Sequence, residues 1–419
     1  MLDESKLRVW IVSELYFPEE TSTGHYMTAL AEQLATKFDV HVLCNQPTYE
    51  ARGIRASNRE RRNGVNIVRC SGLALNKNQL IGKLANMITV TFMLWLQSFF
   101  EIKRRDVVFV VTNPPSLTFC IWFTCWLKRA KCVLICHDVY PDVLIHASTF
   151  WVGSWLIRAI GFANEMLLNR LDAIVAIGRD MRKLLHPRVK GGRVPIEVFT
   201  NWADLDTVHP IPREKTALLS DLGLCDKFVV QYCGNIGRTH NVGILLDAAE
   251  ELVSSPGIHF LIIGSGAQMG NIRRQIANRQ LNNITIRDRV DRSALNDALN
   301  SCDIAVISLN VGMAGVSVPS RMYNILAIGK PILAIMDEES EVARVVAEEG
   351  TGWVVKEDDL SVLVSAIKEA SRRPDLLRVM GERGRVAACT KYTLPVVGAK
   401  FEVLIDELTH HAISAVLDA

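Results

Sequence analysis

Ser320 and Arg321 form the sequence's best candidate for an anion-binding site. They end a glycine-bearing loop, residues 310–321, that leads from a predicted strand at residues 304–307 into a predicted helix. Free backbone N–H groups at a helix start, the helix dipole and an adjacent arginine together attract anions. This segment therefore suits a diphosphate that is bound without a metal ion. The alternative is that Ser320 only caps the helix.

Three other loops place glycine directly after predicted strands. Gly234 and Gly237 would let the backbone approach a ligand, and Arg238 beside them can add a positive charge for phosphate. Gly264 opens a predicted helix but lacks the full spacing of a dinucleotide-binding motif. Gly24, after the first strand, would let a ligand lie against the backbone. A plain turn is the alternative for the loops with Gly234 and Gly264, and a solvated loop is the alternative for the loop with Gly24.

His137 and Asp138 follow a predicted strand at residues 133–136. A histidine at the carboxyl end of a strand, facing a cleft, can hydrogen-bond a sugar hydroxyl or a developing charge. A purely structural histidine is the alternative.

Alternating strands and amphipathic helices must position these residues. Such alternation predicts an α/β chain with doubly wound parallel sheets, whose ligands bind outside the carboxyl ends of the strands. An irregular stretch at residues 200–212, with two prolines, separates two such series. We therefore predict domains at residues 1–204 and 205–395 and a helical tail at residues 396–419.

The predicted strands lie at residues 8–13, 40–43, 67–69, 107–111 and 133–137, then at 228–232, 259–263, 284–286, 304–307 and 331–335. A helix is predicted near residues 25–37, and the predicted helices of the second half lie at residues 242–254, 269–280, 293–300, 320–328 and 341–349.

Charge and cysteine content exclude several functions. The 419 residues carry 47 Lys and Arg against 45 Asp and Glu, and this net charge of +2 argues against a nucleic-acid partner. The ten cysteines show neither a CxxC pair nor zinc-ligand spacing, which indicates reduced thiols in a cytoplasmic protein. The amino terminus carries acidic residues where a secretory signal would be basic, so nothing suggests export.

In their order along the chain, these segments resemble glycosyltransferase family 4, the retaining nucleotide-sugar transferases of the GT-B fold. That fold has two Rossmann-like domains that face a cleft. The branch resembled builds O-antigen, capsule and other exopolysaccharides. The segments that carry the resemblance are YFPE at 16–19 with Gly24, HDVYP at 137–141, NWAD at 201–204, GNIG at 234–237, LIIGSG at 261–266, CDIAV at 302–306, PSRMY at 319–323 and AIGKP at 327–331.

The resemblance implies a role for each matched position. His137 would contact the donor sugar near the reacting carbon, while Arg238 and Arg321 would stabilise the diphosphate that leaves as the sugar becomes oxocarbenium-like. No metal or other cofactor is expected, and the donor would be a UDP- or GDP-linked sugar. The acceptor would be lipid-linked or a saccharide. The predicted nucleotide-sugar site comprises Gly24, Gly234, Asn235, Gly237, His240, Gly264, Arg289, Val290, Gly315, Val316, Ser320 and Asn324.

The sequence departs from the family at four of these positions. The family's two glutamates, eight positions apart, align with Val316 and Asn324, and its diphosphate-binding arginine and lysine align with Asn235 and His240. The Asn324 amide can still hydrogen-bond a ribose hydroxyl, and we expect Arg238 to supply the missing charge. Two alternatives stay open: a non-catalytic GT-B-like subunit that binds a partner, and a GT-B-fold sugar-nucleotide epimerase or phosphorylase.

Two apolar segments of the first half predict contact with a membrane. Residues 84–100 contain no charged residue and are followed by basic residues at 103–105, while residues 116–127 are followed by Lys128, Arg129 and Lys131. Aromatic and apolar faces with basic flanks suit a helix that lies on anionic lipid. We predict monotopic attachment to the cytoplasmic face of the inner membrane. The alternative is a helix buried against the sheet.

Overall fold

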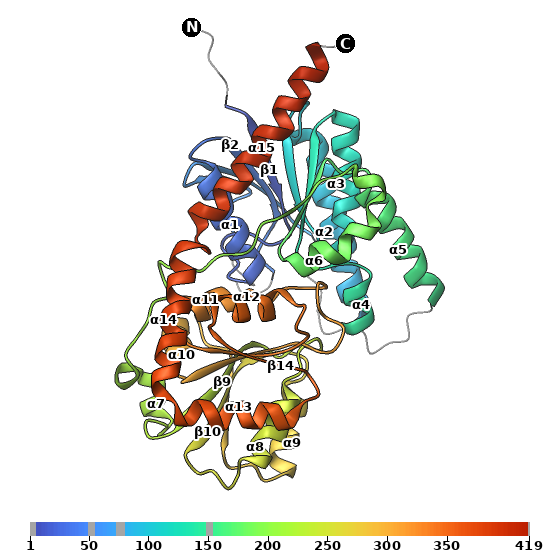
Figure 1. Ribbon diagram of the computed structural model, residues 1–419. Coiled ribbons are helices and arrows are strands. Elements are labelled where there is room, and N and C mark those ends of the chain that lie inside the picture. The colour runs from blue at the N-terminus through green and yellow to red at the C-terminus, as the bar shows by residue number, and fades with distance from the viewer. Residues whose placement is uncertain (1–5, 49–54, 73–79, 148–153, 418–419) are drawn as a thin grey trace.

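The computed structural model describes residues 6–48, 55–72, 80–147 and 154–417, which form two α/β units (Figure 1). Each unit is built on its own mainly parallel sheet, with helices on both faces. The predicted fold of two doubly wound domains is therefore confirmed.

The first sheet has the strand order β3-β4-β2-β1-β5-β6-β7-β8. Its central strands are short runs of valine and isoleucine that are buried on both faces, as parallel strands between helix layers must be. Only β3, with the sequence RERR, pairs antiparallel, and its charged side chains suit an edge strand. The strands are β1 Arg8–Val12, β2 Asp39–Asn45, β3 Arg59–Arg62, β4 Val65–Cys70, β5 Val107–Val111, β6 Lys131–Cys136, β7 Ala173–Ala176 and β8 Ile196–Val198.

The second sheet is parallel throughout and has the order β11-β10-β9-β12-β13-β14. The chain changes direction across each sheet, between β1 and β5 in the first and between β9 and β12 in the second. A ligand crevice is expected at such switch points. The strands are β9 Phe228–Asn235, β10 Ile258–Ser265, β11 Ile284–Arg287, β12 Ile304–Ser308, β13 Ile332–Ile335 and β14 Gly352–Val355.

Helices connect the strands of both sheets. Those of the first half are α1 Ser22–Leu34, α2 Leu80–Glu101, α3 Pro115–Lys128, α4 Asp142–Ala147, α5 Ser154–Leu168 and α6 Arg179–Leu185. Those of the second half are α7 Ala217–Asp221, α8 Gly243–Glu251, α9 Met269–Asn278, α10 Arg292–Asn300, α11 Arg321–Ala327, α12 Glu341–Glu349, α13 Leu360–Arg372, α14 Pro374–Thr390 and α15 Leu394–Leu417.

Most predicted elements are present with shifted ends. The strand at residues 107–111 and the helix at residues 341–349 have the predicted bounds. The first helix begins three residues earlier than predicted, because Thr21 accepts a hydrogen bond from the Gly24 N–H and starts the helix at Ser22. Four short strands, β3, β7, β8 and β14, were absent from the prediction.

The predicted helical tail is the helix α15, which returns to the first domain and lies beside α1 and the first sheet (Figure 1). Its buried residues Val397 and Phe401 belong to the core of that domain. The Phe401 ring lies 5.6 Å from the ring of Phe109 and 4.9 Å from that of Phe199. The helix α15, which follows the second domain in the sequence, therefore completes the first domain.

The two apolar segments of the first half are the helices α2 and α3, which contact each other on one face of the first sheet. Val90, Leu94, Leu117 and Ile121 are buried there, as the alternative of a packed helix requires. Other apolar side chains of both helices are exposed. Within the described part of the chain, no helix is long and apolar enough to cross a membrane.

Candidate functional site

A cavity of about 610 Å³ lies between the two domains, at the carboxyl ends of the strands β6, β9 and β10. The start of α1 forms its wall on the side of the first domain, and the loop before α11 lies opposite. The lining residues of the first domain are Glu20, Thr21, Ser22, His25, Tyr26 and Asp138. Those of the second domain are Cys233, Gly234, Asn235, His240, Ile263, Gly264, Ser265, Arg289, Val290, Arg292, Leu295, Leu299, Ser317, Val318, Pro319, Ser320, Arg321 and Asn324.

Arg321, the first residue of α11, is a cation in this cavity. Its guanidinium carbon lies 4.6 Å from the ring centre of Tyr232, and its Nη1 donates to the Cys233 carbonyl at 3.4 Å. A Cβ atom on Gly234 would lie 2.8 Å from the same nitrogen, so the guanidinium occupies the space that a side chain would take. Among the described residues, Arg321 has no carboxylate partner, which leaves its charge for an anionic ligand.

Ser320 joins the two domains across the cavity. Its Oγ lies 2.9 Å from the Oγ of Ser22 at the start of α1. The Ser320 side chain makes no capping hydrogen bond to α11, so the capping alternative is wrong. Both hydroxyls lie on residues that line the cavity, where they can also bind a ligand.

Asn324 is held by the segment that links the domains. Its Oδ1 accepts a hydrogen bond from the Asp204 N–H at 3.0 Å. None of the contacts of the described residues occupies its amide nitrogen, so Asn324 keeps a donor for a ligand. The Asp204 carboxylate in turn accepts from Arg292 Nη2 at 2.5 Å, and the same nitrogen lies 2.8 Å from His25 Nδ1.

The two positions where the family has cations are uncharged in the cavity. Burial, and to a smaller extent the nearby Arg321, lower the pKa of His240 to about 3, so its imidazole is neutral at pH 7. Asn235 also lines the cavity and carries no charge. Arg238, which we expected to replace the missing charge, is exposed and is not among the lining residues. The cations that line the cavity are Arg289, Arg292 and Arg321.

The predicted sugar-binding histidine, His137, does not line the cavity. Burial lowers the pKa of His137 to about 4, and its buried Nε2 has no hydrogen-bond partner in the residues that the structure describes. The neighbouring Asp138 lines the cavity instead. Burial raises the pKa of its carboxyl to about 6, and its N–H donates to Thr112 Oγ1 at 3.2 Å.

Four further predicted residues do not line the cavity. A Cβ on Gly24 would lie 2.5 Å from the Glu19 carbonyl oxygen, and one on Gly237 would lie 2.9 Å from Asn235 Nδ2, so both glycines permit close packing within their loops. Gly315 and Val316 lie deeper, where their backbone contacts the first domain. Of the predicted nucleotide-sugar residues, the cavity brings together Gly234, Asn235, His240, Gly264, Arg289, Val290, Ser320 and Asn324.

Several residues that line the cavity were not predicted as site residues from the sequence: Ser22, His25, Tyr26, Asp138 and Arg292. His25 and Arg292 each follow a predicted strand and stand at or near a predicted helix start, which is the signal that could have identified them. Among the described residues, no group of three or more His, Cys, Asp or Glu side chains is placed to hold a metal ion.

Comparison with known proteins gives matches over both domains. Residues 21–202 match the family described as "Glycosyl transferase 4-like domain", and residues 220–387 match "Glycosyl transferases group 1". The chain is 28% identical to the probable glycosyltransferase WbjE of Pseudomonas aeruginosa, over 86% of this chain and 89% of that protein. It is 24% identical to the putative colanic acid biosynthesis glycosyl transferase WcaI of Escherichia coli, over 88% and 93%.

A solved structure shows the same fold over nearly the whole chain. Anabaena HepE in complex with UDP-glucose superposes with a TM-score of 0.72 and 13% identity, over 96% of this chain and all of that one. The predicted GT-B fold is thus confirmed. Two matched domains in this order, with a cavity between them, establish that the chain belongs to the family 4 glycosyltransferases and is an enzyme of the hexosyltransferase type.

Proposed function

We propose that the enzyme transfers a sugar, with retention, from a nucleotide-sugar donor to a lipid-linked or saccharide acceptor in cell-surface polysaccharide biosynthesis. The observation that carries the proposal is Arg321, a cation without a carboxylate partner among the described residues, in a cavity between the domains. The related WcaI is named for colanic acid biosynthesis, and HepE, which shares the fold, binds UDP-glucose. A UDP- or GDP-linked sugar is the donor class that fits a cationic cavity in this fold.

The residues of the cavity can carry the reaction electrostatically. Cleavage of the glycosyl–phosphate bond leaves positive charge on the anomeric carbon and negative charge on the diphosphate. Arg321 and the hydroxyl of Ser320 would stabilise the diphosphate, because fixed donors need no reorganisation as the charge develops. The free amide nitrogen of Asn324 would donate to a ribose hydroxyl, in place of the family's glutamate.

Thermal shift with UDP-sugar and GDP-sugar panels tests the proposal, since a ligand that binds only the folded state raises the melting temperature. We expect one donor to give a selective shift that is lost in Arg321→Ala and kept in Arg273→Ala. Arg273 is the matched control, an exposed arginine of the same domain that is paired with Asp288. No shift with any sugar nucleotide would favour a non-catalytic subunit. Acceptor-free conversion of the donor would indicate an epimerase, and phosphate-dependent cleavage a phosphorylase.

We also propose that the enzyme binds the membrane surface through α2, α3 and α5, three helices that pack on the same face of the first sheet. Exposed apolar side chains lie on all three: Ile88, Phe92, Met93, Leu96, Phe100, Phe123, Trp126, Leu127, Trp155, Leu156, Phe162 and Met166. Exposed basic residues border them at Lys103, Arg104, Arg105, Arg129, Arg158 and Arg170. Aromatic anchors with basic neighbours match an anionic lipid surface, where the cytoplasmic face of the inner membrane would bring the enzyme to a lipid-linked acceptor.

Flotation with phosphatidylglycerol vesicles tests this attachment. We expect the protein to float with the vesicles and the double variant Phe100→Ser, Trp126→Ser to stay behind. The matched control replaces Val253 and Val386, two exposed valines of the second domain, by serine. A protein that never floats, or a control that is lost equally, would contradict the proposal.

A further inference from the structure

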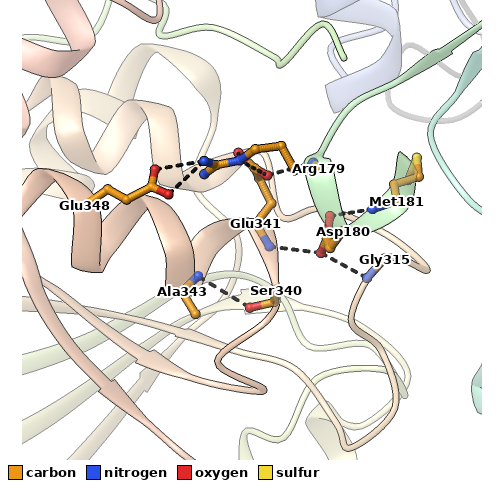
Figure 2. Close-up of polar contacts among 8 residues, drawn as sticks. All are labelled: Arg179, Asp180, Met181, Gly315, Ser340, Glu341, Ala343 and Glu348. Carbon is orange, nitrogen blue, oxygen red and sulfur yellow. Dashed lines mark hydrogen bonds and ion pairs between the residues drawn. The ribbon is translucent and has the colours of Figure 1, made fainter. Parts of the chain in front are cut away.

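A buried carboxylate of the first domain holds the backbone of the second. Asp180 lies in the first turn of α6 and is 6% exposed. Its Oδ1 accepts from the Met181 N–H at 2.7 Å, within the same helix. Its Oδ2 accepts from the N–H groups of Gly315 and Glu341 in the second domain, each at 2.9 Å (Figure 2).

Two glycines allow the domains to approach this closely. A Cβ on Gly315, whose φ is +74°, would lie 2.7 Å from the Asp180 carbonyl oxygen. A Cβ on Gly178 would lie 2.8 Å from Val318 Cγ2 and 2.5 Å from Asp180 Oδ1. Side chains at these positions would push the domains apart, because each added Cβ would overlap an atom of the other domain.

The charge of Asp180 is met by backbone groups and not by a cation. Among the described residues its hydrogen-bond partners are the N–H groups of Met181, Gly315 and Glu341, and the Glu341 N–H belongs to the first turn of α12. Such charge-assisted bonds are roughly twice as strong as neutral ones. The arginine beside it, Arg179, is engaged elsewhere: its Nε donates to Glu341 at 3.0 Å and its Nη1 to Glu348 at 2.8 Å (Figure 2).

The segment that Asp180 holds continues into the donor cavity. The Val139 N–H donates to the Val316 carbonyl at 2.9 Å, and Asp138 and Ser317 form an antiparallel bridge. The next residues, Ser317 to Arg321, line the cavity and include both members of the predicted anion site. The position of this wall of the cavity is thus set by contacts with the first domain.

We propose that Asp180 is a positioning residue, which fixes residues 315–321 against the first domain and so places Ser320 and Arg321 for the donor. Asp180 does not line the cavity, and it acts through the N–H of Gly315. The effect of this residue on transfer rests on the proposed function, whereas its hold on the second domain does not.

Amide hydrogen exchange in the full chain tests the hold on the second domain without any ligand. In Asp180→Ala we expect exchange of peptides from residues 310–320 to rise about tenfold, the effect of one lost hydrogen bond of this kind. Peptides from β9 and β10 should exchange as before. Lys183→Met is the matched control, since it removes the exposed ion pair between Lys183 and Glu339, which also joins the domains. Unchanged exchange at residues 310–320, or an equal rise throughout the chain, would overturn the proposal.

A second variant covers the case in which Asp180→Ala does not fold. Asp180→Asn keeps the shape, but its neutral amide accepts hydrogen bonds less strongly and cannot satisfy all three N–H donors. We expect a smaller rise in exchange, again confined to residues 310–320 and to the start of α12. Exchange as in the unaltered protein would overturn the proposal in this variant too.

Kinetics with the donor identified by thermal shift separate positioning from stability. We expect Asp180→Ala to lower kcat/KM for the donor about tenfold, with a melting temperature within a few degrees of the original. A lower melting temperature with unchanged kcat/KM would show a structural role only. If no donor is found, the exchange result still decides whether Asp180 holds the second domain, so failure of the proposed function remains distinguishable.

Discussion

Gly234 controls the position of the main cation of the cavity. The Arg321 guanidinium lies where a side chain of residue 234 would be, with a Cβ 2.8 Å from Nη1 and 2.9 Å from Cζ. We expect Gly234→Ala to displace Arg321 and to weaken donor binding about tenfold or more, since a misplaced guanidinium loses a charge-assisted bond. Titration calorimetry with the donor measures the change. Gly243→Ala, at a position with open space for a Cβ, should bind as the original protein does; equal affinity in both variants would contradict the prediction.

The Asp138 carboxyl should make stability depend on pH. Burial raises its pKa from 3.8 to about 6 in the folded protein, so the folded state holds this proton more tightly than the unfolded chain. Its contribution to stability is therefore present below about pH 4 and is lost as the pH rises through about 6. We expect Asp138→Asn to raise the free energy of unfolding on the order of 1 kcal/mol at pH 8 and to leave it nearly unchanged at pH 4. Urea unfolding at both pH values checks this, and an equal effect at both would show that the charge is not what matters.

Single residues were predictable where the chemistry was local. Ser320 and Arg321 could be selected because a strand, a glycine loop and a helix start follow one another in the sequence. A similar signal marks His25 and Arg292 one by one, but their contacts with each other and with Asp204 could not be predicted, because these residues come from the linker and from two different domains. Arg238 was selected for its charge beside a glycine loop, but charge alone does not say whether a side chain faces the cavity.

At the scale of elements, the bounds of a strand or helix were predicted correctly where the local sequence pattern was strong. The strand β5 has five consecutive buried apolar residues, and α12 has a capping serine at Ser340 and a left-handed Gly350 at its end. Both were predicted with their observed bounds. The edge strand β3 reads RERR, which has no apolar alternation, so only its pairing with β4 identifies it. The helical nature of α15 was visible in the sequence, but its docking on the first domain was not.

The docking of α15 predicts an effect of its residues on the first domain. Phe401 is 3% exposed and packs against Phe109 and Phe199. We expect Phe401→Ala to lower the free energy of unfolding by about 3 kcal/mol, through lost burial and the cavity left behind. Val403→Ala, on the exposed side of the same helix, should change it by less than about 0.5 kcal/mol. Urea unfolding measures both, and similar values for the two variants would contradict the packing.

At the scale of the whole molecule, both domains were predictable but their contacts were not. Each sheet is encoded by its own apolar runs, whereas the interface joins residues such as Asp180 and Gly315 that are far apart in the sequence. No periodicity relates such positions. The interface also explains why residues 178 and 315 are glycines, because a Cβ at either position would overlap an atom of the other domain. The composition of the two loops did not predict this contact.

The proposed attachment through α2, α3 and α5 predicts that vesicle binding depends only partly on salt. Basic residues contribute through a field that 1 M salt screens to about 3 Å, whereas burial of aromatic side chains in lipid is not weakened by salt. We expect vesicle binding to fall severalfold between 0.1 and 1 M NaCl, on the scale of the screening length, but not to vanish. Co-sedimentation across this range measures it. Complete release would show that charge alone holds the protein to lipid, and no change would show that the basic residues play no part.

The return of α15 to the first domain also governs how this protein is made and how its parts can be exchanged. Residues 394–417 are synthesised after the second domain, so the core around Phe109 and Phe199 stays incomplete until that domain has been made. The first domain therefore cannot complete its core before α15 has been made, by which time the second domain can already fold. For the same reason, a chimera that takes its second domain from another enzyme needs two junctions, one in the linker and one before Leu394. Recombination that replaces the second domain during evolution would likewise need two breakpoints in the gene, one in the linker and one before the codon of Leu394.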